Sequence, residues 1–184
     1  MTTSPARTAV VPVAEIFELR RSVLRPGLPA QTAVFAEDAA PGTFHIAAYD
    51  ERGTVRACVS FFPEALPEEG DGDAASEEGA TAYRFRGMAS DPAVRGLGYG
   101  VAVLRAGLDQ AAARGAGLAW CNGRTSARGF YEHQGFTVTG EEFVVESVGP
   151  HYRFTIKLPG VSGPDCRTPA VEFTAWQAGS TMTT

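Results

Sequence analysis

The chain has 184 residues, of which 44% are hydrophobic and 20% charged, and its formal net charge is −5. This length and composition are typical of one globular domain with a sizeable core. No stretch reaches the roughly 18 apolar residues of a membrane span, and the N-terminal segment lacks the apolar core of a signal peptide. We therefore expect neither a membrane-spanning nor an exported protein.

The negative charge is concentrated in one segment. Residues 64–80 carry seven acidic side chains and no basic one, which leaves a net charge of +2 on the rest of the chain. Because this segment is rich in glycine and poor in aromatic residues, we expect a mobile loop; attraction of a cationic amine is the alternative. The arginines are scattered and Lys157 is the only lysine, so no nucleic-acid partner is expected.

The three cysteines, Cys58, Cys121 and Cys166, are far apart in the sequence. Their spacing matches neither a metal site nor a disulfide framework. We expect reduced thiols in a cytoplasmic protein and no bound metal.

The elements predicted for the first half begin with a helix from Pro12 to Pro26. Its expected buried face consists of Val13, Ile16, Phe17, Val23 and Leu24. Two strand-like runs then flank residues 51–53, which is typical of a hairpin. A further strand over 81–90 ends at Asp91 and Pro92.

The second half begins with a long helix that ends near Gly115. The residues expected on its buried face are Val101, Leu104, Leu108 and Ala111 or Ala112. Residues 117–124 read as a short strand, 125–135 as a short helix, and 136–148 and 151–158 as two final strands. This order predicts an α/β (α+β) fold, a mixed sheet flanked by helices with one β-α-β unit at its centre. Residues 159–184 have weak periodicity and are expected to form an extended tail.

Three glycines alternate at the start of the long helix, in the sequence RGLGYG over 95–100. A helix N-terminus leaves about four N–H groups unpaired and carries about half a positive charge, so glycines there give an anion access to bare amides. A Rossmann fingerprint fails because Val101 stands at its third glycine, and a Walker loop fails because no lysine follows. The alternative is that Gly98 and Gly100 only permit a tight turn.

The pattern Arg95-x-x-Gly98-x-Gly100 between a strand and a long helix resembles the pyrophosphate-binding motif of the GNAT superfamily of acyl-CoA-dependent N-acetyltransferases. MASDP precedes it, and ARGFYEHQGF over 127–136 resembles the second motif of that family, a short helix with a tyrosine that ends in Gly-Phe. The resemblance covers about residues 81–158. It implies a mixed, mostly antiparallel sheet with an acyl-CoA site on the central β-α-β unit, in an acetyltransferase domain of residues 1–158.

The resemblance also implies acetyl-CoA as the cosubstrate. Its pyrophosphate would lie on the N–H groups of residues 96–101, and its pantetheine arm between two strands that splay apart, pairing with the first. One N–H of that strand would bind the thioester oxygen. The implied contact residues are Met88, Ala89, Ser90, Arg95, Gly96, Leu97, Gly98, Tyr99, Gly100, Val101, Asn122 and Arg124. Arg124 stands where the family often has an asparagine, and Asn122 is an alternative for that contact.

Tyr131 is the residue that the resemblance implies as the general acid. Coenzyme A leaves as a thiolate when the amine attacks, and a tyrosine hydroxyl in the right environment can protonate it. The alternative is that Tyr131 packs in the core beside Phe130. Cys121, on a strand expected to be buried, is predicted to be an inert thiol, so direct transfer in a ternary complex is favoured over a covalent intermediate.

The general base is left open by the sequence. An amine of pKa about 10.4 must lose a proton before it attacks. Candidates are His45, His151 and either Glu37 or Asp38, with water relaying to a carboxylate as a further alternative; His133 is expected on an outer helix face.

These observations predict transfer of an acetyl group to a primary amine, on a small molecule. No membrane partner is expected, and a homodimer, common in similar proteins, has no identifiable interface in the sequence. A non-catalytic acyl-CoA-binding sensor or assembly module is the alternative. ATP or a dinucleotide on the glycine loop is a third hypothesis.

Overall fold

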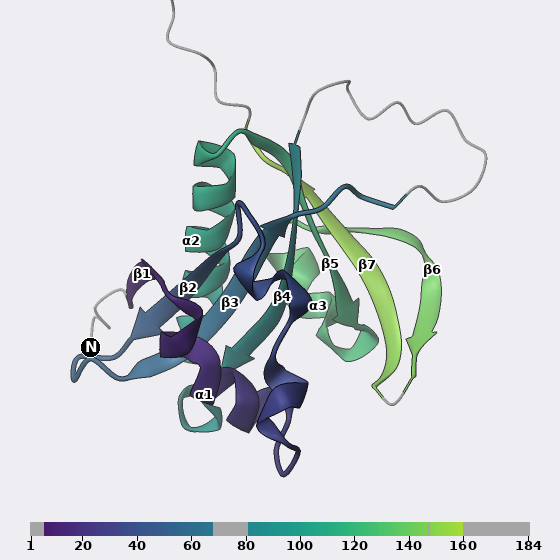
Figure 1. Cartoon of the computed structure of the whole chain (residues 1–184). Coiled ribbons are helices and arrows are strands. Elements are labelled where there is room, and N and C mark those ends of the chain that lie inside the picture. Colours follow the sequence, from purple (N-terminus) through teal and green to yellow (C-terminus); the bar gives the residue numbers. More distant parts are fainter. Residues whose placement is uncertain (1–5, 68–80, 147, 160–184) are drawn as a thin grey trace, which may run out of the picture.

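The computed structural model describes residues 6–67, 81–146 and 148–159 (Figure 1). Most of the predicted acidic loop, from residue 68 onward, and the predicted tail from residue 160 onward lie outside these ranges.

Seven strands form one sheet in the order β1-β2-β3-β4-β5-β7-β6. The strands are β1 (Arg7–Val11), β2 (Phe44–Tyr49), β3 (Val55–Pro63), β4 (Thr81–Ser90), β5 (Ala116–Arg124), β6 (Thr137–Val145) and β7 (Gly149–Lys157). Every neighbouring pair is antiparallel except β4 and β5, which are parallel. The mixed, mostly antiparallel sheet is thus confirmed, and β1 is a strand that the sequence analysis did not predict.

Among the described residues, three α-helices cover the sheet: α1 (Val13–Leu24), α2 (Tyr99–Ala113) and α3 (Arg128–His133). α1 packs on one face, over β2, β3 and β4, and α2 packs on the other face, over the same part of the sheet and β5 (Figure 1). α3 lies on the α2 side, where Tyr131 joins the main core. We call these two sides of the sheet the α1 face and the α2 face. No helix in the described ranges is long and apolar enough to cross a membrane.

The buried face of α2 differs from the predicted one. Leu104 and Ala111 are buried as expected, but Val103 and Gly107 complete the face, while Val101 is only half-buried. The reason lies at Gly107, where an added Cβ would be 2.1 Å from Cε2 of Phe61. The absence of a side chain there lets the helix approach the sheet closely, and this rotates its buried face away from Val101.

Candidate active site

The central feature of the site is a gap between β4 and β5. The two strands pair from Thr81 and Ala116 to Arg84 and Trp120, and then diverge (Figure 1). Beyond this point β4 pairs only with β3 and β5 only with β7. In the described structure, the backbone groups of 85–90 and 121–124 that point into the gap therefore have no partner strand, while the opposite edges of the two segments pair with β3 and β7. An extended ligand with amide groups can pair with such an edge.

A bulge in β4 decides which side chains face each side of this gap. The register with β3 shifts between Cys58 and Ser60, opposite Gly87, which has a φ of 65°. This is the arrangement of a β-bulge, in which an extra residue re-aims its neighbours. As a result Met88 turns toward the start of α2, whereas Gly87 lies against Phe35 on the α1 face. A glycine inside a strand pattern is a known signal for a bulge, and it was not used in the sequence analysis.

The glycine turn connects β4 to α2. A 3₁₀ turn over Pro92–Val94 is capped by Asp91, whose carboxylate accepts a hydrogen bond of 2.9 Å from the Ala93 N–H. Gly96 and Gly98 follow with φ of 80° and 87°, and Gly98 is the N-cap of α2 with no side-chain cap. An added Cβ at either position would have no atom within 4 Å. The turn therefore requires the backbone conformation of Gly96 and Gly98, and the space beside them is open. Gly100 lies inside α2, and an added Cβ there would be 3.1 Å from Oγ of Ser90. The binding of an anion at this turn stays a prediction.

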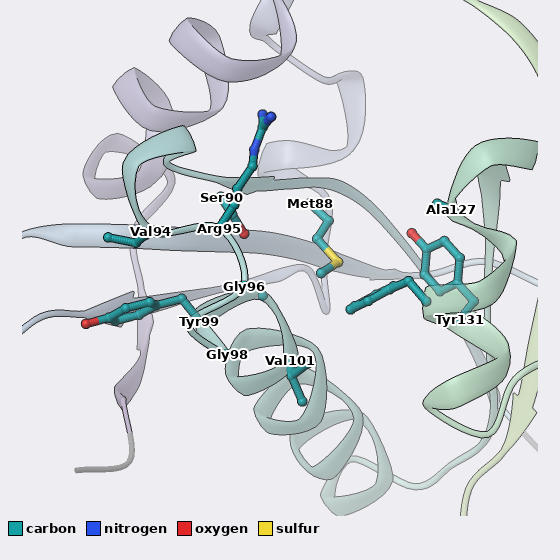
Figure 2. Close-up of a pocket in the computed structure, with 12 residues that line it drawn as sticks. Met88, Ser90, Val94, Arg95, Gly96, Gly98, Tyr99, Val101, Ala127 and Tyr131 are labelled. Carbon is teal, nitrogen blue, oxygen red and sulfur yellow. The ribbon is translucent and has the colours of Figure 1, made fainter. Parts of the chain in front are cut away.

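The space in front of this turn is a cavity of about 420 Å³ (Figure 2). Its lining residues are Met88, Ser90, Val94, Arg95, Gly96, Gly98, Tyr99, Gly100, Val101, Ala127, Phe130 and Tyr131. The cavity runs from the helix start to Tyr131, and in Figure 2 the Arg95 side chain points away from Tyr131 and Val101. Val94, Ala127 and Phe130 were not predicted; Phe130 was considered only as a core neighbour of Tyr131.

The other predicted contact residues lie outside the cavity lining. Ala89 is buried on the α1 face, Leu97 is 61% exposed, and Arg124 is exposed at the end of β5. Asn122 follows Cys121 of the main core, and because side chains alternate along a strand it lies on the α1 face. Its Oδ1 is buried without a hydrogen-bond partner among the described residues.

Tyr131 is both a core residue and a cavity residue. Its ring is 8% exposed and stacks on Phe154 at a centroid distance of 4.6 Å. Burial, with a further contribution from Cys121, raises the pKa of its hydroxyl well above the ordinary value. The hydroxyl is therefore neutral at pH 7. Burial also raises the pKa of Cys121 to about 12, which leaves a thiol rather than a nucleophilic thiolate.

The two histidines proposed as bases lie on the α1 face, away from the cavity lining. His45 is 5% exposed, with Nδ1 2.8 Å from Oγ of Ser60. Burial lowers the pKa of His45; the charge of Asp38 opposes this shift, and the charge of Arg20 adds a smaller contribution in the same direction as burial. His151 is 7% exposed, and its Nδ1 donates to the Gly149 carbonyl at 2.8 Å. His133 is exposed, as expected.

A buried ion pair on the α1 face engages the next candidate base. The Arg20 side chain is fully buried and binds Asp38 through two hydrogen bonds of 2.8 and 2.6 Å. Burial alone would raise the pKa of Asp38, but the bonds from Arg20 and from the Phe35 N–H lower it. Asp38 is thus an ionised structural anchor. Glu37 is half-buried and contacts Arg86 at 3.4 Å.

Comparisons with known proteins agree with this geometry. A family model described as the acetyltransferase (GNAT) family matches residues 13–136. The chain is 30% identical over 141 residues to the uncharacterized N-acetyltransferase YitI of Bacillus subtilis, covering 77% of this chain and 89% of that protein.

Among solved structures, the fold is similar to that of Escherichia coli ElaA, with a TM-score of 0.63 and 14% identity over 82% of this chain and 98% of that one. It is also similar to the GNAT N-acetyltransferase YhbS from Escherichia coli in complex with CoA, with a TM-score of 0.62 and 18% identity over 86% of each chain. At these identities the two structures support the fold.

Proposed function

Because the chain belongs to the GNAT family of acetyltransferases, we propose that it transfers an acetyl group from acetyl-CoA to a primary amine of a small molecule, by direct attack in a ternary complex. The observation that carries this proposal is one cavity that extends from the uncapped start of α2, past Met88 and Ser90 on the part of β4 that has diverged from β5, to Tyr131. Such a cavity suits a ligand with an anionic end and an amide-bearing arm.

The chain offers matching groups to both parts of coenzyme A. Free N–H groups at the start of α2 suit the pyrophosphate, and glycines at 96, 98 and 100 keep side chains out of its way. From Met88 to Ser90, the edge of β4 that faces the gap has no partner strand among the described residues, although its other edge pairs with β3. This free edge suits the amide groups of the pantetheine arm. A β4 N–H that points into the gap would stabilise the negative charge that develops on the thioester oxygen, an effect of about 3 kcal/mol in comparable sites.

Tyr131 is the proposed general acid. The thioester supplies an activated acetyl group and a thiolate leaving group, and the Tyr131 hydroxyl is neutral at pH 7 and so carries a proton for that thiolate. Burial raises its pKa, so donation requires that the negative charge left on the tyrosine oxygen be stabilised when coenzyme A is bound. The place of Tyr131 in the cavity lining, across from Met88 (Figure 2), puts it on the side of the gap where that thiolate would form.

The amine would reach the gap from the opposite side, since the cavity on the α2 face is filled by coenzyme A in this scheme. Asp38 is held by Arg20, and His45 is buried against Ser60. Glu37 and His151 then remain as candidate bases on the α1 face, with a water relay to Glu37 as the alternative.

The decisive experiment combines ligand binding with turnover. Thermal unfolding is measured with acetyl-CoA, ATP, NAD and no ligand; a ligand at 100 times its Kd adds about 2.7 kcal/mol to stability. Amine-dependent release of free thiol is then followed for the wild type, for Tyr131→Phe, and for Tyr152→Phe on β7 as a matched control.

We expect stabilisation by acetyl-CoA alone and a rate for Tyr131→Phe about 100-fold lower, with stabilisation by acetyl-CoA retained and Tyr152→Phe unchanged. Stabilisation by acetyl-CoA without thiol release for any amine would favour the sensor hypothesis. Stabilisation by ATP or NAD alone would contradict the acyl-CoA assignment.

A further inference from the structure

The α1 face beside the gap carries arginine and aromatic side chains that the proposed cosubstrate site does not use. Arg84 of β4 is paired in register with Trp120 of β5, at the point where the gap opens. Arg86 lies two residues farther along β4. Because residues two apart on a strand share a face, both guanidinium groups lie on the α1 face, where Arg84 contacts Trp120 and Arg86 contacts Phe35.

The ion pair between Arg86 and Glu37 is long. Nη1 of Arg86 is 3.4 and 3.5 Å from the two Glu37 oxygens, whereas charge-assisted hydrogen bonds are normally about 2.7–2.9 Å. Arg20 by contrast binds Asp38 at 2.6 Å, and Arg56 binds Asp91 at 2.6 Å. The Arg86 guanidinium is fixed over the Phe35 ring at 3.9 Å, and its side chain is 35% exposed. It is therefore an oriented cation that is accessible to a ligand.

The surroundings of Arg86 are short of negative charge. Burial lowers the pKa of Arg86, and the charge of Glu37 opposes that shift. The positive charges of Arg84, Arg25 and Arg20 lower the pKa of Arg86 further. An additional carboxylate here would favour the charged form and relieve repulsion among these cations.

Two polar atoms beside the gap have no hydrogen-bond partner among the described residues. The first is Nε of Arg84. The guanidinium of Arg84 lies over Trp120, with Cζ 4.8 Å from the ring centroid, and its Nη1 donates a hydrogen bond of 3.0 Å to Oε1 of Glu64. Oδ1 of Asn122, across the gap on β5, is the other. A buried polar atom without a partner is unfavourable, so a ligand group that enters the gap and reaches the donor on β4 or the acceptor on β5 would stabilise the bound state.

From these observations we infer that the acceptor is an amine that also carries a carboxylate, an amino acid in the broad sense, with its carboxylate bound by Arg86 and Arg84 and its amine directed toward Asn122 and the gap. The inference rests on the proposed acetyl transfer and names its substrate class.

The test compares matched acceptors in the thiol-release assay with acetyl-CoA. Each amino acid is measured beside its carboxamide and beside the amine of the same skeleton without the carboxylate, for example phenylalanine, phenylalaninamide and 2-phenylethylamine. The variants are Arg86→Gln and Arg86→Lys, with Arg52→Gln in the exposed β2–β3 turn as the matched control. Stabilisation by acetyl-CoA is measured for every variant, to show that the cosubstrate site is intact.

We expect at least one amino acid to be preferred about tenfold or more over both of its partners. Arg86→Gln should raise the KM of that amino acid about tenfold to a hundredfold and leave the partners unchanged. Arg86→Lys should recover part of the loss, and Arg52→Gln should equal the wild type. Equal use of acids, amides and simple amines, or an unchanged KM in Arg86→Gln, would overturn the inference while acetyl transfer stands.

A binding measurement keeps the two proposals separable. If no amine releases thiol, stabilisation of the wild type by amino acids in thermal unfolding still reports on the arginine site. Stabilisation that is lost in Arg86→Gln but not in Arg52→Gln would support carboxylate recognition without transfer. No stabilisation by any amino acid, together with no turnover, would refute both.

Discussion

Replacing Gly98 with alanine tests the role of the glycine turn, and Gly53→Ala is its matched control. The two glycines have φ of 87° and 81°, and an added Cβ at either has no atom within 4 Å. An alanine therefore meets the same backbone strain at both positions, about 1–2 kcal/mol for a left-handed conformation. Only the methyl group at position 98 would stand beside the start of α2.

The expected magnitudes separate strain from lost binding. For a domain of this size 1 kcal/mol shifts Tm by about 2–4 °C, so both variants should unfold a few degrees below the wild type without ligand. Acetyl-CoA at 100 times the wild-type Kd adds about 2.7 kcal/mol to the wild type and to Gly53→Ala. If Gly98→Ala weakens the pyrophosphate contact about 10- to 100-fold, the same concentration adds only about 1.4 to 0.4 kcal/mol.

The assay is thermal unfolding of the three proteins over a series of acetyl-CoA concentrations. We expect parallel losses of Tm without ligand and a much smaller ligand-induced shift for Gly98→Ala alone. Equal ligand-induced shifts in the two variants would refute the reasoning, because the glycine at 98 would then serve only the turn.

Two further predictions concern stability. Gly107→Ala should lower the free energy of unfolding by about 1–3 kcal/mol in urea, despite the better helix propensity of alanine. The reason is that its Cβ would lie 2.1 Å from Cε2 of buried Phe61. An unchanged stability would show that the core around Phe61 can rearrange to accept the methyl group. His45 has a lowered pKa in the folded state, so its contribution to stability is present above the unfolded pKa of about 6.5 and is lost as pH falls through the folded value. The free energy of unfolding of the wild type should therefore decline from about pH 7 to 5.5 more steeply than that of His45→Gln. Equal slopes in the two proteins would exclude His45 as the cause. The pKa of Asp38 is also lowered in the folded state, but its contribution to stability is lost only below about pH 4.

The β4–α2–β5 unit was predictable because its signals are local. Alternation in the strand, the glycines at the turn and the helical spacing up to Gly115 each depend on residues close in sequence. The buried face of α2 was not predictable in the same way. It depends on how Phe61, from a distant strand, fits against Gly107.

The α1 face was the least predictable part of the site. Helical spacing places Arg20 on the same face as Ile16 and Val23, but the sequence does not reveal its partners, and only the fold brings Asp38 and Ser60 to it. Asp38 was considered as a base because an isolated carboxylate does not reveal its partner. The opposite orientations of Met88 and Gly87 likewise depend on a bulge that arises from pairing with β3.

The short parallel pairing of β4 with β5 also has a consequence for folding. The sheet consists of an N-terminal group of strands, β1 to β4, and a C-terminal group, β5 to β7. The two groups are joined in the sheet by the pairing of β4 with β5, which on β4 extends only from Thr81 to Arg84. Within each group the strands are joined along much of their length by antiparallel ladders. We expect the two groups to behave as partly independent cooperative units, with native-state amide exchange fastest where they meet. A molecule inserted between them acts as a missing strand and couples the units, so that saturation should slow exchange on both sides of the sheet at once.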